Sequence, residues 1–164
     1  MSEIKERCLA NVPLERAPDY LQRYIRDIEA DAAGQIVLSV RLPLERLGIE
    51  RRIEISKAVS VHFDAAADAA SQPRRMRAIS WEPADGGPYP HFTGAIGIRP
   101  SGGSDGCWIT IEGQYDPPLG LIGDAFDALV GKHIARVTAR NLLDEIAIAM
   151  EMAYAMDASA PART

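Results

Sequence analysis

Residues 107–156 read CWITIEGQYDPPLGLIGDAFDALVGKHIARVTARNLLDEIAIAMEMAYAM. The alternation in 107–115 indicates a strand, and Pro117 and Pro118 end it, because proline can neither donate to a strand ladder nor continue a helix. Residues 122–157 contain no proline and predict one helix of roughly 50 Å. A helix that long, in a small chain made otherwise of strands, needs a large apolar surface to lie on. We therefore predict a strongly curved antiparallel sheet wrapped around a C-terminal helix, a shape that tends to enclose a cavity.

Length and composition are those of one globular domain. The 164 residues are 47% apolar and 25% charged, so we expect a single domain over 1–157 and a disordered tail over 158–164. The net charge of −5 and the lack of a basic stripe argue against nucleic acid as a partner. No apolar run reaches the roughly 18–20 residues of a membrane span, and the first residues have no hydrophobic signal core, so we expect a cytoplasmic protein. The two cysteines, Cys8 and Cys107, are too few for a disulfide framework.

Alternation of apolar and polar residues predicts about six strands. They cover residues 4–12, 36–42, 53–63, 74–82, 91–99 and 107–115. A short amphipathic helix is predicted over 19–32, where Leu21, Tyr24, Ile25 and Ile28 recur at helical spacing. Helices separated from an antiparallel meander define an α+β fold rather than a doubly wound parallel sheet. The glycine cluster SGGSDG lies between two strands and opens no helix, so it does not fit a dinucleotide-binding turn.

Several stretches resemble a known superfamily. Residues 113–151, GQYDPPLGLIGDAFDALVGKHIARVTARNLLDEIAIAME, are similar to the closing segment of bacterial SRPBCC proteins, also called START-like or polyketide cyclase/dehydrase proteins. VRLPLERLGIERRIEI, MRAISWEP and PYPHFTGAIGIRP resemble middle strands of an uncharacterised branch, so the likeness covers about residues 3–156. The Y-x-P-P-x-G motif marks a strand-to-helix corner and carries no chemistry.

The resemblance implies a helix-grip fold, in which a curved antiparallel sheet holds the C-terminal helix with a hydrophobic pocket between them. Members of the superfamily include lipid and sterol carriers, plant hormone receptors, aromatase/cyclases, ubiquinone-binding proteins and many proteins without a known activity. No motif of this chain matches a catalytic residue of the cyclases, so the resemblance implies no catalytic residue here.

The spacing of the reactive side chains indicates neither a metal site nor a catalytic centre. His62, His91 and His133 fall on separate elements without HxH or HExxH spacing, so we expect no metal and no cofactor. No GxSxG turn occurs, and neither cysteine has an obvious neighbouring cation that would lower its thiol pKa. Asp124 and Asp127 are better explained as favourable charges in the first helical turn than as an acid–base pair.

Two cations share the parity of the apolar side of their strands. If that side faces the long helix, Lys57 and Arg77 point inward, where an unpaired charge is costly. One interpretation is that they anchor a carboxylate or phenolate on an otherwise apolar ligand. The other is that they lie near strand ends, where a long side chain reaches water, or that a bulge reverses the parity. Glu6 has the same inward parity and could pair with either cation.

The remaining candidates for lining a cavity are mostly apolar. They are Trp81, Phe92, Ile96, Ile109, Ile111 and Tyr115 from the strands, and Phe126, Val130, His133, Ile134 and Val137 from the helix. Tyr89 and Phe92 could gate the cavity mouth from the loop around EPADGGPYP, although this segment also reads as a plain surface loop. His133 is equally well explained as a partly buried, hydrogen-bonded histidine.

Three functions are compatible with these patterns. The first is binding or transport of a small hydrophobic molecule, such as a lipid, quinone or polyketide, between the sheet and the helix. The second is a cyclase or dehydrase acting on a hydrophobic substrate in the same cavity, with an inward arginine or histidine moving a proton. The third is an interaction protein with a filled core, acting through a surface or as a homodimer. The sequence leaves the ligand, any reaction and the oligomeric state open.

Overall fold

The computed structural model describes residues 2–31, 35–42, 53–64, 76–87, 89–103, 105–116 and 124–160. The helices and strands within these ranges are, in chain order, β1 (Ser2–Ala10), α1 (Ala17–Ala30), β2 (Gln35–Leu42), β3 (Ile53–Asp64), β4 (Met76–Pro83), β5 (His91–Pro100), β6 (Cys107–Asp116) and α2 (Asp124–Ser159). Each lies within about two residues of its predicted range.

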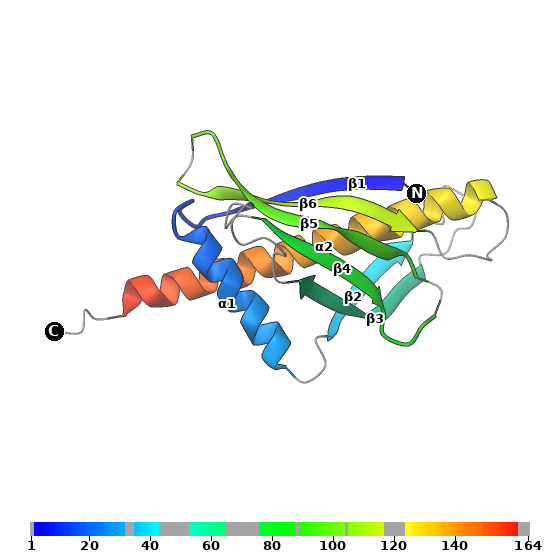
Figure 1. Ribbon diagram of the computed structural model, residues 1–164, viewed down its shortest axis with the longest axis horizontal. Helices are drawn as coiled ribbons and strands as arrows, with labels where there is room; N and C mark the ends of the chain where they lie inside the picture. The colour runs from blue at the N-terminus through cyan, green and yellow to red at the C-terminus, as the bar shows by residue number, and fades with distance from the viewer. Residues whose placement is uncertain are drawn as a thin grey trace.

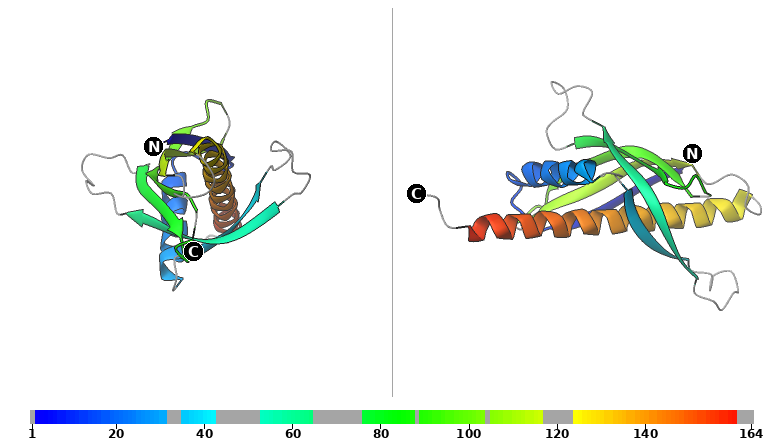
Figure 2. Two further views of the ribbon diagram at one scale, coloured as in Figure 1. Left: turned by 90° about the vertical axis from the view of Figure 1, so that its right-hand side faces the viewer. Right: turned by 90° about the horizontal axis from the view of Figure 1, so that it is seen from below.

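The strands form one antiparallel sheet with the order β1-β6-β5-β4-β3-β2. β1 and β2 are therefore the edges, and the first strand pairs with the last. The sheet curves around α2, which lies along its concave side (Figures 1 and 2). The predicted α+β helix-grip architecture, with a short helix after the first strand and a long C-terminal helix, is confirmed.

α1 extends the wall of the core beyond the sheet. It crosses the C-terminal half of α2 on the same side as the sheet (Figure 2). Its buried face consists of Ala17, Tyr20, Leu21, Tyr24 and Ile25. The Tyr20 hydroxyl donates to Asp157 at 3.0 Å and the Tyr24 hydroxyl to Glu145 at 3.3 Å. These bonds fix α1 on α2, because a buried tyrosine hydroxyl needs a partner.

The strand register arranges the inward side chains in rows across the sheet. In one row Trp81 lies opposite Phe92, and Phe92 lies opposite Tyr115. In the next row Gly94 lies opposite Gly113. A Cβ atom added to Gly94 would lie 2.3 Å from the Glu112 carbonyl oxygen and 2.7 Å from the Phe92 ring. The glycine pair therefore permits the close backbone approach and leaves room for the ring beside it.

The predicted hairpin between β5 and β6 is confirmed. Pro100 pairs with Cys107 at its base. Gly102 has φ +78° and Gly103 φ +154°, a backbone conformation that residues with a Cβ rarely adopt.

Several predictions fall on residues outside the described ranges. These are the turn at 44–48, most of the loop at 64–73, the Pro117–Pro118 corner and the end of the tail at 161–164. The corner is bracketed by the end of β6 at Asp116 and the start of α2 at Asp124. None of the helices in the described part of the chain is long and apolar enough to cross a membrane.

Candidate functional site

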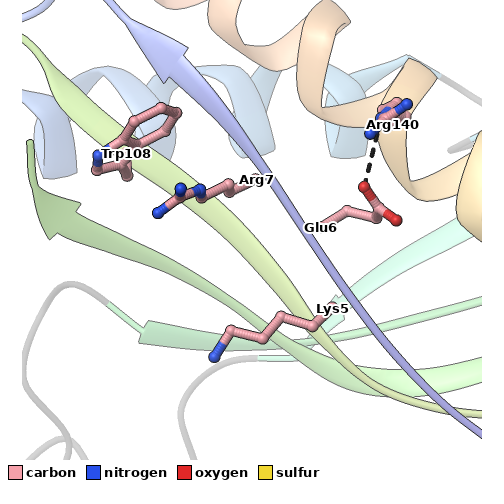
Figure 3. Close-up of a pocket in the computed structure, with 5 residues that line it drawn as sticks. All are labelled: Lys5, Glu6, Arg7, Trp108 and Arg140. Carbon is pink, nitrogen blue, oxygen red and sulfur yellow. Dashed lines mark ion pairs between the residues drawn. The ribbon is translucent and has the colours of Figure 1, made fainter.

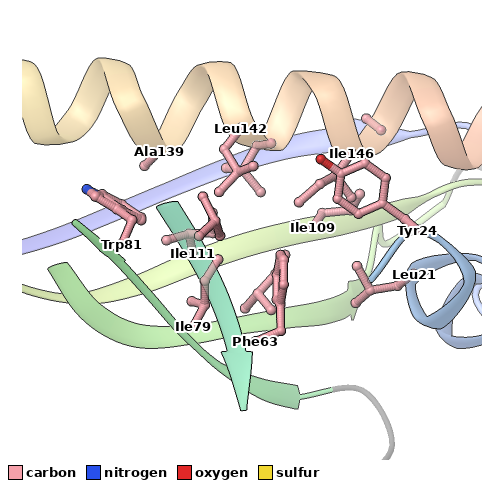
Figure 4. Close-up of a cluster of buried hydrophobic side chains, with 14 of the residues drawn as sticks. Leu21, Tyr24, Phe63, Ile79, Trp81, Ile109, Ile111, Ala139, Leu142 and Ile146 are labelled. Atoms are coloured by element: carbon pink, nitrogen blue, oxygen red, sulfur yellow. The ribbon is translucent and has the colours of Figure 1, made fainter. Parts of the chain in front are cut away.

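The concave face of the sheet and the facing side of α2 form the apolar centre of the molecule. The strand candidates predicted to face inward are all buried: Trp81, Phe92, Ile96, Ile109, Ile111 and Tyr115. From α2, Ile134 is buried, whereas Val130, His133 and Val137 are half-buried. Figure 4 shows Ala139 and Leu142 of α2 above Trp81, Ile79 and Ile111. The structure therefore brings these candidates together on the two sides of one layer.

Trp81 is the unusual member of this layer. Its indole stacks on Phe92 with ring centroids 3.9 Å apart and an angle of 13° between the planes. The side chain is 1% exposed, yet Nε1 has no hydrogen-bond partner within the described part of the chain. Among the described residues it is the one buried side-chain nitrogen or oxygen without a partner. An unpaired buried donor of this kind costs about 1–3 kcal/mol.

Small residues of α2 lie on the helix face that covers the aromatic row. Gly131, Ala135 and Ala139 follow one another at intervals of four, and all three are buried. Small side chains at these positions let the helix backbone lie close to the side chains of the sheet.

Tyr89 lies in the core rather than at an exposed mouth. It is 2% exposed, and its hydroxyl is hydrogen-bonded to the Thr138 hydroxyl of α2. Phe92, the other predicted gate residue, is 1% exposed. Neither side chain has the exposure that a gate requires, because the loop before β5 tucks its aromatic residue beneath the helix. Burial raises the pKa of the Tyr89 phenol, so this hydroxyl stays protonated at neutral pH.

Arg77 lies on the inner face of β4, as the strand parity predicts, but it is not a free cation. Its guanidinium donates a hydrogen bond to the side-chain oxygen of Gln22 on α1. It lies opposite Ile96 of β5 and four residues before Trp81 along β4. The side chains of Lys57 and Phe126 lie outside the described residues, so the predictions made for them stay predictions.

Glu6 is the one buried charged residue among those described, with a side-chain exposure of 6%. Its inward parity is confirmed, and its described partners are two arginines of α2 rather than Arg77. Arg136 Nε lies 2.6 Å from one carboxylate oxygen and Arg140 Nε 3.3 Å from the other. β1 runs beside this flank of α2, and Figure 3 shows Arg140 of the helix next to Glu6 of the strand.

A groove of about 510 Å³ runs along the edge of β1 at this point. It is lined by Lys5, Glu6, Arg7, Trp108 and Arg140. Figure 3 places Arg7 and Trp108 on one side of the strand and the Glu6–Arg140 pair on the other. Arg7 lies over the Trp108 ring at 4.4 Å, and Lys5 pairs with Glu112 at 2.9 Å. The charges along the groove are thus largely matched by groups of the protein itself.

A second surface groove of about 570 Å³ lies between the segment after β1 and the β5–β6 hairpin. It is lined by Pro13, Leu14, Glu15, Pro100, Ser101, Gly102, Gly103, Asp105, Gly106 and Tyr154. Within the described ranges no three His, Cys, Asp or Glu side chains converge as metal ligands.

Cys8 on β1 has an inert thiol. Burial, a hydrogen bond to the Asp144 carboxylate and the negative charges of Asp144 and Glu151 raise its pKa to about 11. Burial likewise raises the pKa of Cys107. Neither thiol is activated as a nucleophile, since reactive cysteines have lowered pKa values.

We expect alkylation of Cys8 by iodoacetamide at pH 8 to be about 100-fold slower than that of a free cysteine, because its thiolate fraction falls tenfold for each unit from the ordinary value of 9.0 to about 11. Asp144→Asn removes one of the negative charges and should accelerate the reaction several-fold. Peptide mass spectrometry over time measures both rates. Equal rates for Cys8 and a cysteine-containing peptide would contradict the prediction.

The comparisons with known proteins give distant structural likenesses. Neither a protein-family model nor a curated protein matches the chain. TTHA0849 from Thermus thermophilus has 12% identity, with 97% of this chain and 100% of that chain covered and a TM-score of 0.45. CV1439 from Chromobacterium violaceum has 14% identity, coverages of 91% and 96%, and a TM-score of 0.42. CalU16 from Micromonospora echinospora has 12% identity, coverages of 94% and 86%, and a TM-score of 0.33. Likenesses at these values assign neither a family nor a function to the chain.

Proposed function

We propose that the protein binds a small hydrophobic molecule between the concave face of the sheet and α2. The observation that carries this proposal is the indole N–H of Trp81, which is buried in an apolar wall and has no partner among the described residues. A core that served stability alone would be better filled at this position by phenylalanine or leucine, which bury no donor. A buried polar atom without a partner calls for an explanation, and a bound molecule that supplies the partner is one.

The surroundings of Trp81 support a hydrophobic ligand. Phe92 and Tyr115 continue the wall on one side, Ile79 lies in the next inward row and Ile111 in the row after that. Affinity would come mainly from apolar area removed from water, at about 25 cal/mol per Å².

A cyclase or dehydrase in this space has weaker support. Proton transfer needs a titratable group near the substrate. Among the described residues, Arg77 is bonded to Gln22, Glu6 is held by two arginines at the edge strand, and the half-buried His133 of α2 already has an interaction of its own. We therefore propose binding without catalysis.

The two tryptophans make a direct test possible. Trp108 lies on the opposite face of the sheet from Trp81, so the Trp108→Phe variant leaves Trp81 as the single tryptophan fluorophore. We expect flat neutral aromatics, added to this variant, to quench its emission with one-to-one stoichiometry and to raise its melting temperature. Native mass spectrometry of the same mixtures checks the stoichiometry.

The matched control is Trp81→Phe, which retains Trp108 and should show no quenching. If no compound in a panel of fatty acids, esters, quinones and polycyclic aromatics quenches Trp81 or shifts the melting temperature, the proposal fails. An interaction protein with a filled core would then be the better description.

A further inference from the structure

The Tyr89 and Thr138 hydroxyls beneath α2 both donate their protons within the protein. Thr138 Oγ1 donates to the Ile134 carbonyl oxygen at 2.8 Å, and a carbonyl oxygen can only accept. A threonine hydroxyl has one proton, so in the contact between Tyr89 and Thr138 the tyrosine must be the donor. The chain of bonds therefore runs from Tyr89 to Thr138 to Ile134. Among the buried side-chain nitrogens and oxygens described here, Trp81 Nε1 is the one without a hydrogen-bond partner.

The charged groups described near the concave face are either paired or lie away from Trp81. Arg77 donates to Gln22, and both carboxylate oxygens of Glu6 face arginines of α2. Arg77 keeps its positive charge, but it lies four residues from Trp81 along β4, roughly 13 Å at 3.3 Å per residue, so a carboxylate beside Trp81 would meet one neutral N–H donor and no adjacent cation among the described side chains. Burying an ion with so few partners is strongly unfavourable.

From these two observations we infer that the ligand is a neutral apolar molecule with a carbonyl-type oxygen, as in a ketone, quinone or ester, and that this oxygen accepts a hydrogen bond from Trp81 Nε1. The inference rests on the proposed function and narrows it to a chemical class. It differs from the expectation that Arg77 anchors a carboxylate or phenolate.

The stack on Phe92 defines how the oxygen must approach. With the rings 3.9 Å apart and nearly parallel, the indole plane is fixed, and so is the direction of its N–H bond. The acceptor must therefore lie close to the plane of the indole, at its edge. Figure 4 shows this edge of Trp81 directed away from Leu142 and Ile146, toward the N-terminal part of α2.

Four naphthalene derivatives of similar size separate the possibilities: 1-acetonaphthone, methyl 1-naphthoate, 1-naphthoate and 1-methylnaphthalene. Titration into the Trp108→Phe variant at pH 7.5 gives an affinity for each. We expect the ketone and the ester to bind at least tenfold more tightly than the carboxylate, and several-fold more tightly than the hydrocarbon. This comparison uses one folded protein and needs no variant of Trp81.

A second measurement locates the bond. In the Trp81→Phe variant, followed by calorimetry, the ketone should lose about fivefold to tenfold in affinity and bind like the hydrocarbon, the worth of one neutral hydrogen bond. The infrared carbonyl band of bound 1-acetonaphthone should lie at lower frequency in the parent protein than in this variant. Binding of 1-naphthoate as tightly as the ketone, or an unchanged preference for the ketone in Trp81→Phe, overturns the inference while the proposed function stands. Failure of all four compounds, the hydrocarbon included, counts against both.

Discussion

Replacing Gly94 by alanine is expected to lower the free energy of unfolding by about 3 kcal/mol, the upper end for added volume in a packed interior. The new Cβ would lie 2.3 Å from the Glu112 carbonyl oxygen and 2.7 Å from the Gly113 Cα, both backbone atoms of β6. Backbone in the middle of a sheet cannot move aside without breaking ladder hydrogen bonds. Urea denaturation followed by circular dichroism measures the loss, which corresponds to about 6–12 °C in melting temperature.

Phe92 distinguishes this clash from ordinary overpacking. The alanine would also meet the Phe92 ring at 2.7 Å, and Phe92→Leu could relieve that contact. The backbone contact would remain, so the Phe92→Leu/Gly94→Ala double variant should not regain stability. Thr93→Ala, on the exposed face of the same strand, is the matched control, with an expected cost below about 1 kcal/mol. A Gly94→Ala variant as stable as Thr93→Ala would contradict the argument.

The elements and their buried faces could be predicted from the sequence because each depends on a local period. Side chains in a strand alternate between the two faces, so a register shift by one residue would expose the whole apolar set. This is why Trp81, Phe92 and Ile109 are buried as their parity predicted. The long helix was predictable for a similar reason, since no proline or capping signal interrupts residues 124–159.

The polar partners could not be predicted because they depend on where the helices cross the sheet. Glu6 and Arg136 are 130 residues apart, and only the path of α2 along β1 brings them together. Gln22 reaches Arg77 because α1 closes the end of the core. Nothing in the local pattern of either segment indicates these contacts.

The burial of Tyr89 could have been predicted from Thr138, a residue elsewhere in the sequence. A loop tyrosine next to prolines reads as exposed, which led to its assignment as a gate. Thr138, however, lies between Val137 and Ala139 on α2, where a hydroxyl facing the sheet needs partners. The Thr138 hydroxyl donates its proton to the Ile134 carbonyl oxygen, so the Thr138 oxygen can still accept a hydrogen bond. A buried tyrosine is a suitable donor for that bond.

Replacing Arg136 and Arg140, the two partners of Glu6, is expected to destabilise the protein about as much as the Gly94→Ala substitution. The carboxylate is 6% exposed, whereas the Arg136 and Arg140 side chains are 52% and 63% exposed. The Arg136→Met/Arg140→Met variant leaves a buried carboxylate without a cation, at a cost of about 3 kcal/mol. Glu6→Gln leaves two arginines that water can solvate, so it should cost only about 1 kcal/mol. Urea denaturation of the three proteins measures the difference.

The asymmetry follows from burial rather than from the number of ion pairs, and a third variant tests that cause. If the unpaired charge is what destabilises the double variant, adding Glu6→Gln to it should restore about 2 kcal/mol, so that the triple variant resembles Glu6→Gln alone. Lys132→Met, an exposed position one turn before Arg136, controls for the loss of a cation from this flank of α2 and should change the stability by less than about 0.5 kcal/mol. A triple variant less stable than the double variant would mean that the arginines act through their packing against β1, and that Glu6 is not the group they neutralise.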